Sequence, residues 1–298
     1  MKISLITDEI SADPETAFEL GVAWGVRDFE LRGFETQRVP LFTDYQKQRL
    51  RELLDEFDVQ IIAISPGLFK IPLPARNRER FPLRASDIHL YENWRDAKSL
   101  VQYHRTELLP ASLEYARTLG VNRVIIFSFH RGECSPVNVP EEVLIILKEA
   151  AELAEKSGIQ LCLEVEDQFW GDTGSRTAGI VAQINHPALG INWDPGNAFV
   201  AGEKPYPDGY QAARAFIRHV HFKDVQQKPP GSFHYVINGE IDWAGQLRAL
   251  KEDCYMGYIS IETHMQPKIF NAQASLKRLR MLMEKVCEKE PRDEGNRD

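Results

Sequence analysis

The feature that most constrains the fold of this chain is a regular alternation of short apolar segments with amphipathic segments. The short segments have the apolar and β-branched character of strands, whereas the longer ones repeat apolar residues at helical spacing. The segments expected as strands are 3–7, 27–31, 59–65, 123–128, 159–164, 190–193, 219–222 and 257–261, and those expected as helices are 15–24, 44–57, 100–119, 140–156, 175–184, 210–217, 242–250 and 271–286.

Eight such units predict an α/β fold, a closed (β/α)8 TIM barrel. Strands that alternate with helices favour a parallel sheet with right-handed crossovers, and barrels of this kind use about 250 residues as one domain. The sequence has no GxGxxG after the first strand and no GxxxxGK[ST], which disfavours dinucleotide-binding and P-loop folds. We expect a single barrel domain over residues 1–287.

Two stretches depart from the alternation. Residues 66–98 hold prolines at 66, 72, 74 and 82 and aromatic residues at 69, 81, 91 and 94, so we expect a long insertion after the third strand. An insertion of this length is typically functional, and its aromatic residues suit either a cover over a pocket or the contact of a homo-oligomer. Residues 288–298 are almost wholly polar and predict a solvated tail.

Composition narrows the range of partners. The formal net charge is -8, from 44 acidic and 36 basic residues, which argues against a surface that binds nucleic acid. No apolar run approaches the ~20 residues of a membrane span, and no signal-like segment precedes the first strand, so we expect a cytoplasmic protein. The four cysteines form no CxxC pair and predict neither a thiolate zinc site nor a disulfide framework.

Four late strands end in an ionisable residue. These residues are Glu164, Asp194, His221 and Glu262. The carboxyl ends of barrel strands meet at the catalytic face, so the four side chains should converge there if they point inward. Side chains two positions apart share a face of a strand, and the residues below the four are small or polar, as befits a barrel interior: Cys162, Asn192, His219 and Ser260.

Three carboxylates and one imidazole form a shell suited to one divalent cation, such as Mn²⁺, Mg²⁺, Co²⁺ or Zn²⁺. Without a cation the carboxylates would repel one another, so a bound metal resolves the arrangement. Taken singly, each residue has a plainer explanation: Asp194 as a turn residue, His221 as a hydrogen-bonded core histidine, and the glutamates as members of buried ion pairs. That all four end strands of the same half-barrel favours the metal site.

The order of motifs around these residues resembles the xylose isomerase-like TIM barrel family of sugar and sugar-phosphate isomerases and epimerases. The motifs are Glu164, Asp194-Pro-Gly-Asn197, His219-Val-His221-Phe-Lys223-Asp224, Ile237-Asn-Gly239-Glu240-Ile-Asp242-Trp243 and Ile261-Glu262. The resemblance implies that Glu164, Asp194, His221 and Glu262 bind one divalent metal. In the ketose 3-epimerase branch, the glutamates at the positions of Glu164 and Glu262 are also the proton-transfer pair.

Other residues are candidates for contacts with substrate. Asn197 stands where that branch usually has a substrate-binding histidine, and Lys223 has the charge to hold a substrate oxygen or phosphate. His130 follows the fourth strand and Glu30 lies on the second, so each is placed to reach the pocket or to support its loops. Glu166, after the fifth strand, is a further candidate for substrate contact, with support of the site from behind or a place in an exposed acidic pair as the alternatives.

The leading hypothesis is a metal-dependent isomerase or epimerase of a small sugar, free or phosphorylated. A cation stabilises the enediolate that forms when one glutamate removes a proton beside a carbonyl, and the second glutamate returns a proton. The alternative is a dehydratase of a cyclic polyol or keto acid, of the inosose or dehydroshikimate dehydratase type, on the same site. A nuclease of the endonuclease IV type would need more histidines, and a non-catalytic binding barrel is the remaining class.

Overall fold

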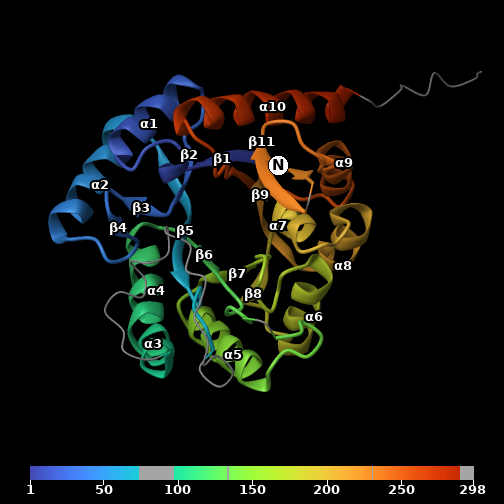
Figure 1. The fold of residues 1–298 in the computed structure, drawn as a ribbon. Coiled ribbons are helices and arrows are strands. Elements are labelled where there is room, and N and C mark those ends of the chain that lie inside the picture. Colours follow the sequence, from blue (N-terminus) through green and yellow to red (C-terminus); the bar gives the residue numbers. More distant parts are fainter. Residues whose placement is uncertain (74–96, 133, 230, 289–298) are drawn as a thin grey trace, which may run out of the picture.

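The computed structural model describes residues 1–73, 97–132, 134–229 and 231–288, and within them eight parallel strands close into a barrel (Figure 1). Their order round the ring is β1-β12-β9-β8-β7-β6-β5-β2. The strands are β1 (Lys2–Ile6), β2 (Asp28–Leu31), β5 (Gln60–Leu68), β6 (Arg123–Ile126), β7 (Gln160–Glu164), β8 (Leu189–Trp193), β9 (Ile217–Phe222) and β12 (Tyr258–Ile261). The predicted (β/α)8 TIM barrel is confirmed.

Helices surround the ring (Figure 1). The longer ones are α1 (Pro14–Ala23), α2 (Asp44–Phe57), α4 (Leu109–Thr118), α5 (Glu141–Lys156), α6 (Gly174–Ile184), α9 (Trp243–Glu252) and α10 (Lys268–Glu288). Their local sequences explain where they begin: Thr43 and Gln46 form a capping box at α2, and the Asp13 carboxylate caps α1. No helix in the part of the chain that the structure describes is long and apolar enough to cross a membrane.

The expected helix over 100–119 is interrupted. The structure has α3 (Ala97–Tyr103), a π-helical segment (His104–Leu108) and then α4. Pro110 is at the second position of α4, where its missing N–H cannot complete the hydrogen bond of a regular helix, so the preceding turn is wider. Within that turn the buried His104 Nδ1 accepts a hydrogen bond of 2.9 Å from the Phe69 N–H, which ties the turn to the end of β5.

Several short elements escaped prediction. They are α7 (Pro195–Val200) directly after β8, and two hairpins, β3 (Gly33–Phe34) with β4 (Gln37–Arg38) and β10 (Asp224–Lys228) with β11 (Ser232–Val236). The expected helix over 210–217 is shorter than predicted: α8 (Tyr210–Ala213) passes into a 3-10 turn (Arg214–Phe216), and β9 begins at Ile217. Of the predicted insertion at 66–98, residues 66–68 belong to β5 and residues 97–98 to α3, while 74–96 lie outside the described residues. Residues 289–298 of the predicted tail also lie outside them.

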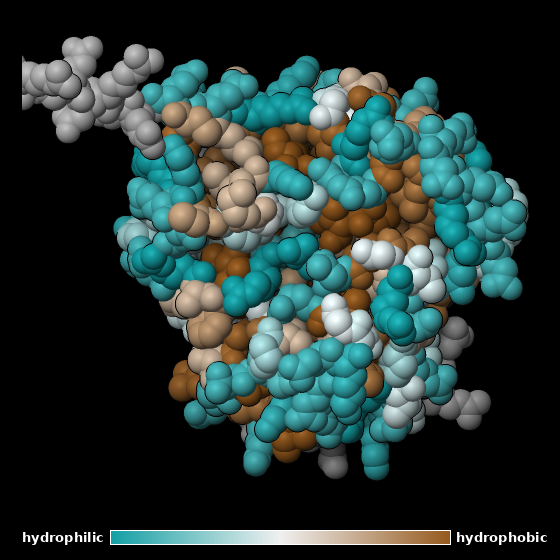
Figure 2. Space-filling view, turned by 180° about the vertical axis from the view of Figure 1, so that it is seen from behind, coloured by the Kyte–Doolittle hydropathy of each residue, from teal (hydrophilic) through white to brown (hydrophobic). Residues whose placement is uncertain are grey.

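The apolar core lies between the barrel and its helices. Strand residues that face the helices, among them Leu161, Leu163, Ile191, Trp193 and Ile259, are fully buried there. Viewed from behind, the surface is mainly hydrophilic, with hydrophobic residues in patches between (Figure 2). Inside the ring, buried polar residues such as Ser4, Glu30, Asn192, His219 and Ser260 lie among apolar ones such as Ile6 and Ile125, so the interior offers polar support to a charged site at its mouth.

Candidate metal centre

The structure brings together the four side chains selected by the strand pattern. Glu164 ends β7, Asp194 follows β8, His221 lies near the end of β9, and Glu262 follows β12. These four strands are consecutive in the ring. One ligand atom from each residue lies within 4.8 Å of the others, and all four residues are buried. The cluster is therefore compact enough to surround a single ion.

His221 turns its two ring nitrogens in opposite directions. Nδ1 faces the carboxylates, at 3.3 Å from Glu262 Oε2, 3.5 Å from Glu164 Oε1 and 3.9 Å from Asp194 Oδ2. Nδ1 is buried and has no hydrogen-bond partner among the described residues. Nε2 faces the carboxylate of Glu30 instead. A buried ring nitrogen that faces three carboxylate oxygens can share a metal ion with them, or form ion pairs with them when the ring is protonated.

The loop after β8 orients Asp194. Its Oδ1 accepts a hydrogen bond of 2.9 Å from the Asn197 N–H, because Asp194 is the N-cap of α7. Its Oδ2 points to the cluster, where Lys223 Nζ lies at 2.7 Å. The same Nζ lies 2.7 Å from Glu262 Oε2, so a buried ammonium bridges two of the four residues.

Burial and these contacts shift the pKa values of Asp194, Glu262 and His221. Burial raises the pKa of Asp194 to about 6 although Lys223 opposes the shift. Burial also raises the pKa of Glu262, but Lys223, His264 and His221 outweigh it and hold that pKa well below its usual range. Burial lowers the pKa of His221, yet the nearby Glu30, Glu164 and Glu262 raise it well above its usual value. Without metal, a protonated imidazole and an ammonium thus offset part of the negative charge of the three carboxylates.

The donor set fits a divalent cation. Three carboxylates and one imidazole nitrogen suit Mn²⁺, Mg²⁺, Co²⁺ or Zn²⁺, and the partnerless Nδ1 faces the centre of the cluster. A metal would replace the proton on that nitrogen, since a ligating histidine must be neutral.

A cavity of about 780 Å³ opens next to the cluster. Glu164 and Glu262 line it, together with Arg32, Lys70 and His264, whereas Asp194 and His221 are 0% and 1% exposed and lie beneath. The volume is in the range of small-molecule sites. Further side chains on its wall include Arg38, Ser65, Phe127, Phe233 and Tyr235.

The candidates for substrate contacts lie around this cavity rather than on its wall. The Asn197 amide donates to Val165 O at 2.9 Å and to Glu166 Oε2 at 2.8 Å, and both side chains are buried. Lys223 is buried between its two carboxylates. His130 is more exposed, and its Nε2 lies 3.3 Å from Gln168 Oε1.

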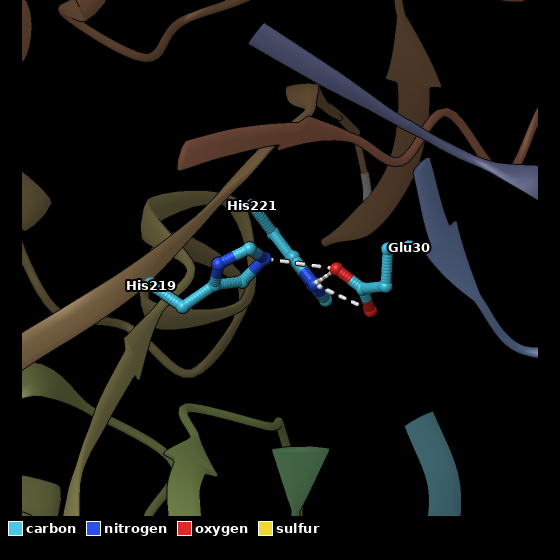
Figure 3. Close-up of side chains that lie close together, drawn as sticks. All are labelled: Glu30, His219 and His221. Atoms are coloured by element: carbon cyan, nitrogen blue, oxygen red, sulfur yellow. Dashed lines mark hydrogen bonds and ion pairs between the residues drawn. The ribbon is translucent and has the colours of Figure 1, made fainter. Parts of the chain in front are cut away.

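Glu30 also departs from the expected position. It is fully buried beneath the cluster, where it contacts the rings of His219 and His221 (Figure 3). The alternation of side chains along the strand predicts that Glu30 faces inward, but it does not predict how deep in the barrel Glu30 lies.

Two residues at the site were missed from the sequence. Arg32 Nη1 donates to Glu262 Oε1 at 2.8 Å and Nη2 to Glu9 Oε1 at 2.5 Å. His264 Nε2 lies 3.3 Å from Glu262 Oε1, and its ring packs on Tyr235 at 5.1 Å between centroids. The signal for Arg32 was its place directly after β2 and two residues after the inward-facing Glu30.

Comparison with known proteins identifies the family of the fold. The family model described as xylose isomerase-like TIM barrel matches residues 18–282. The chain is 27% identical over 259 residues to the L-ribulose-5-phosphate 3-epimerase UlaE of Shigella flexneri serotype 5b (strain 8401), covering 83% of this chain and 84% of the relative.

Solved structures share the fold at lower identity. The probable 3-DHS dehydratase AsbF of Bacillus anthracis superposes with a TM-score of 0.69 at 18% identity, covering 94% of this chain and 99% of the other. The IOLI protein, whose structure holds a zinc atom, gives a TM-score of 0.69 at 20% identity, covering 96% of this chain and 99% of the other. With the family model matched over most of its length, the chain belongs to the xylose isomerase-like TIM barrel family.

Proposed function

We propose that this chain is a divalent-metal-dependent isomerase or epimerase of a small sugar or sugar phosphate, with Glu164 and Glu262 as its proton-transfer pair. That the chain is an enzyme was predicted and is confirmed by its relatives, an epimerase and a probable dehydratase among them. The proposed reaction type rests on one observation: of the four residues, the two glutamates line the cavity, while Asp194 and His221 lie beneath it.

The two glutamates line the cavity from different strands: Glu164 ends β7, and Glu262 follows β12. Each presents a carboxylate oxygen to the same nitrogen of His221, at 3.5 Å and 3.3 Å. We propose that a substrate above them meets one carboxylate on either side, which suits removal of a proton from one face and its return to the other.

Glu262 is held in the ionised form that a general base needs, although the contacts that hold it there also weaken it as a base. Arg32, Lys223 and His264 all contact its carboxylate, and the low pKa that Lys223, His264 and His221 impose keeps it ionised at neutral pH. Arg32 and Lys223 contact different oxygens of the carboxylate, so they also fix its orientation. When bound, a divalent cation would stabilise the negative charge that develops on the substrate oxygen as the proton leaves.

The residues proposed to hold the ion are Glu164, Asp194, His221 and Glu262. The zinc atom in the IOLI structure supports a metal on this fold. The UlaE relative acts on a ketose phosphate by its name, so L-ribulose and L-ribulose 5-phosphate are the first compounds to test.

Solvent exchange tests the proposal. We expect the Mn²⁺-loaded protein in deuterium oxide to exchange the proton beside the substrate carbonyl and to form the epimer or isomer, both followed by proton NMR. Glu262→Gln and Glu164→Gln should each lower turnover by about 10²–10⁴-fold, the usual contribution of a general acid or base. Glu252→Gln, which alters an exposed carboxylate at the end of α9, is the control.

The single variants also distinguish the reaction types. In a two-base epimerisation each variant should still exchange the proton of one epimer, the one that faces the remaining glutamate. Loss of water with an absorbing enone product would assign the dehydratase reaction instead. Cleavage of an abasic duplex would assign a nuclease, and full activity of Glu262→Gln would remove this residue from the proton-transfer pair.

A further inference from the structure

A fully buried carboxylate lies directly beneath the proposed metal ligands. Figure 3 shows the carboxylate of Glu30, from β2, facing the rings of His219 and His221, both from β9. Glu30 Oε2 is 2.8 Å from His219 Nε2, and both Glu30 oxygens are 3.2 Å from His221 Nε2. Strands β2 and β9 are not neighbours, because β1 and β12 stand between them in the ring. Glu30 therefore reaches across the barrel interior.

Such a carboxylate needs hydrogen-bond donors to be stable. Its side chain is 0% exposed, and an ionised carboxylate buried without partners is strongly destabilising. The two histidine rings are the partners that the structure provides. An ionised carboxylate only accepts hydrogen bonds, so the ring nitrogen facing it must carry the hydrogen.

This requirement decides the tautomer of His221. With the hydrogen on Nε2, the lone pair of the neutral ring is on Nδ1, and Nδ1 is the nitrogen that faces Glu164 and Glu262. The Asn192 side-chain amide also faces this nitrogen: Nδ2 is 3.2 Å from Nε2, and Oδ1 has no partner among the described residues, so the amide fits a protonated Nε2 only when its O and N positions are exchanged.

His219 holds Glu30 in place. Its Nε2 lies 2.9 Å from Ser260 Oγ as well as 2.8 Å from Glu30 Oε2, and Ser260 Oγ is 2.7 Å from Ser4 Oγ. This buried polar layer spans β1, β12, β9 and β2, so the position of Glu30 is determined by several strands.

We infer that Glu30 is a positioning residue that fixes the His221 imidazole with Nε2 protonated and Nδ1 turned to the metal. The inference rests on the proposed metal site but not on the substrate or reaction. Partners of this kind orient metal-ligating histidines and raise their basicity, and their loss typically lowers metal affinity by about 10–100-fold.

Nitrogen NMR of the Zn²⁺-loaded protein tests the tautomer without any variant. Zn²⁺ is diamagnetic, and we expect a one-bond proton correlation for His221 Nε2 and none for Nδ1. A proton on Nδ1 with a bare Nε2, or a wild-type protein that fails to bind Zn²⁺, would overturn the inference.

Calorimetric titration with Zn²⁺ tests the contribution of Glu30. Glu30→Gln should weaken Zn²⁺ binding by about 10–100-fold. Asp172→Asn is the matched control: Asp172 is a buried carboxylate paired with Arg131 and Arg176, away from His221, and its variant should bind Zn²⁺ within about two-fold of the wild type. Equal affinity of Glu30→Gln and wild type would refute a positioning role. Because no substrate is used, correct tautomer and affinity with no epimerase or isomerase activity would refute only the proposed function.

Discussion

Lys223→Met should destabilise the metal-free protein strongly and the metal-loaded protein much less. Lys223 Nζ is 2.7 Å from Asp194 Oδ2 and 2.7 Å from Glu262 Oε2, and the three side chains are at most 5% exposed. Methionine preserves most of the buried stem but removes the charge. Two buried carboxylates would then lose a partner that they share.

The size of the effect follows from that burial. Removal of one partner from a buried ion pair costs about 3–5 kcal/mol because the remaining charge stays buried, and Lys223 serves two carboxylates at once. A divalent cation bound by the same carboxylates supplies the missing charge, so saturating metal should reduce the loss by about half or more. By linkage, each 1.4 kcal/mol of that reduction means about tenfold tighter metal binding by the variant.

Urea unfolding, monitored by circular dichroism, measures the loss of stability without metal in EDTA and with metal in saturating MnCl₂. Lys148→Met is the control, since Lys148 is exposed on α5 and its replacement should change the free energy of unfolding by about 0.5 kcal/mol at most. A loss below about 1 kcal/mol for Lys223→Met in EDTA, or the same loss with and without metal, would refute the reasoning.

Two further predictions concern pH and backbone packing. Metal affinity should rise from pH 5 to pH 8. Burial raises the pKa of Asp194 to about 6 and neighbouring carboxylates raise that of His221, so at low pH both residues bind protons that the metal must displace. Titration calorimetry in two buffers should show this proton release, and a pH-independent affinity would contradict the prediction. Gly190→Ala should lower the free energy of unfolding by about 1–3 kcal/mol, because its Cβ would lie 2.4 Å from Arg218 Cγ and 2.8 Å from a backbone oxygen. In chemical denaturation Gly179→Ala, in open space on α6, should instead stabilise by about 0.5–1 kcal/mol, and an equal loss in both variants would disprove the steric explanation.

The fold and the cluster were predictable because both follow from simple periodicity. The alternation of strands and helices predicted the ring, and inward positions at consecutive strand ends predicted that Glu164, Asp194, His221 and Glu262 would meet. The hairpin β10–β11 was missed because its first strand, with Gln226, Gln227 and Lys228 in sequence, lacks the apolar alternation of a half-buried strand.

The depth of each inward residue could not be read from the sequence. It depends on the stagger between strands, and β2 shifts its register against β5 between Phe29 and Glu30. Glu30 was therefore expected at the pocket but lies beneath it. Lys223 was likewise expected to meet substrate, because the sequence does not show that two carboxylates lie within 2.7 Å of its ammonium.

The contact of Glu30 with His221 has a consequence for how the metal centre assembles. All four proposed ligands belong to the second half of the chain, between residues 164 and 262, yet the carboxylate that orients one of them is residue 30, on the far side of the bore. A fragment starting after β5 would retain every ligand but lack this anchor. During refolding, the metal affinity of the native protein should therefore appear only when the ring closes. Formation of the half-barrel that holds the ligands should not be enough.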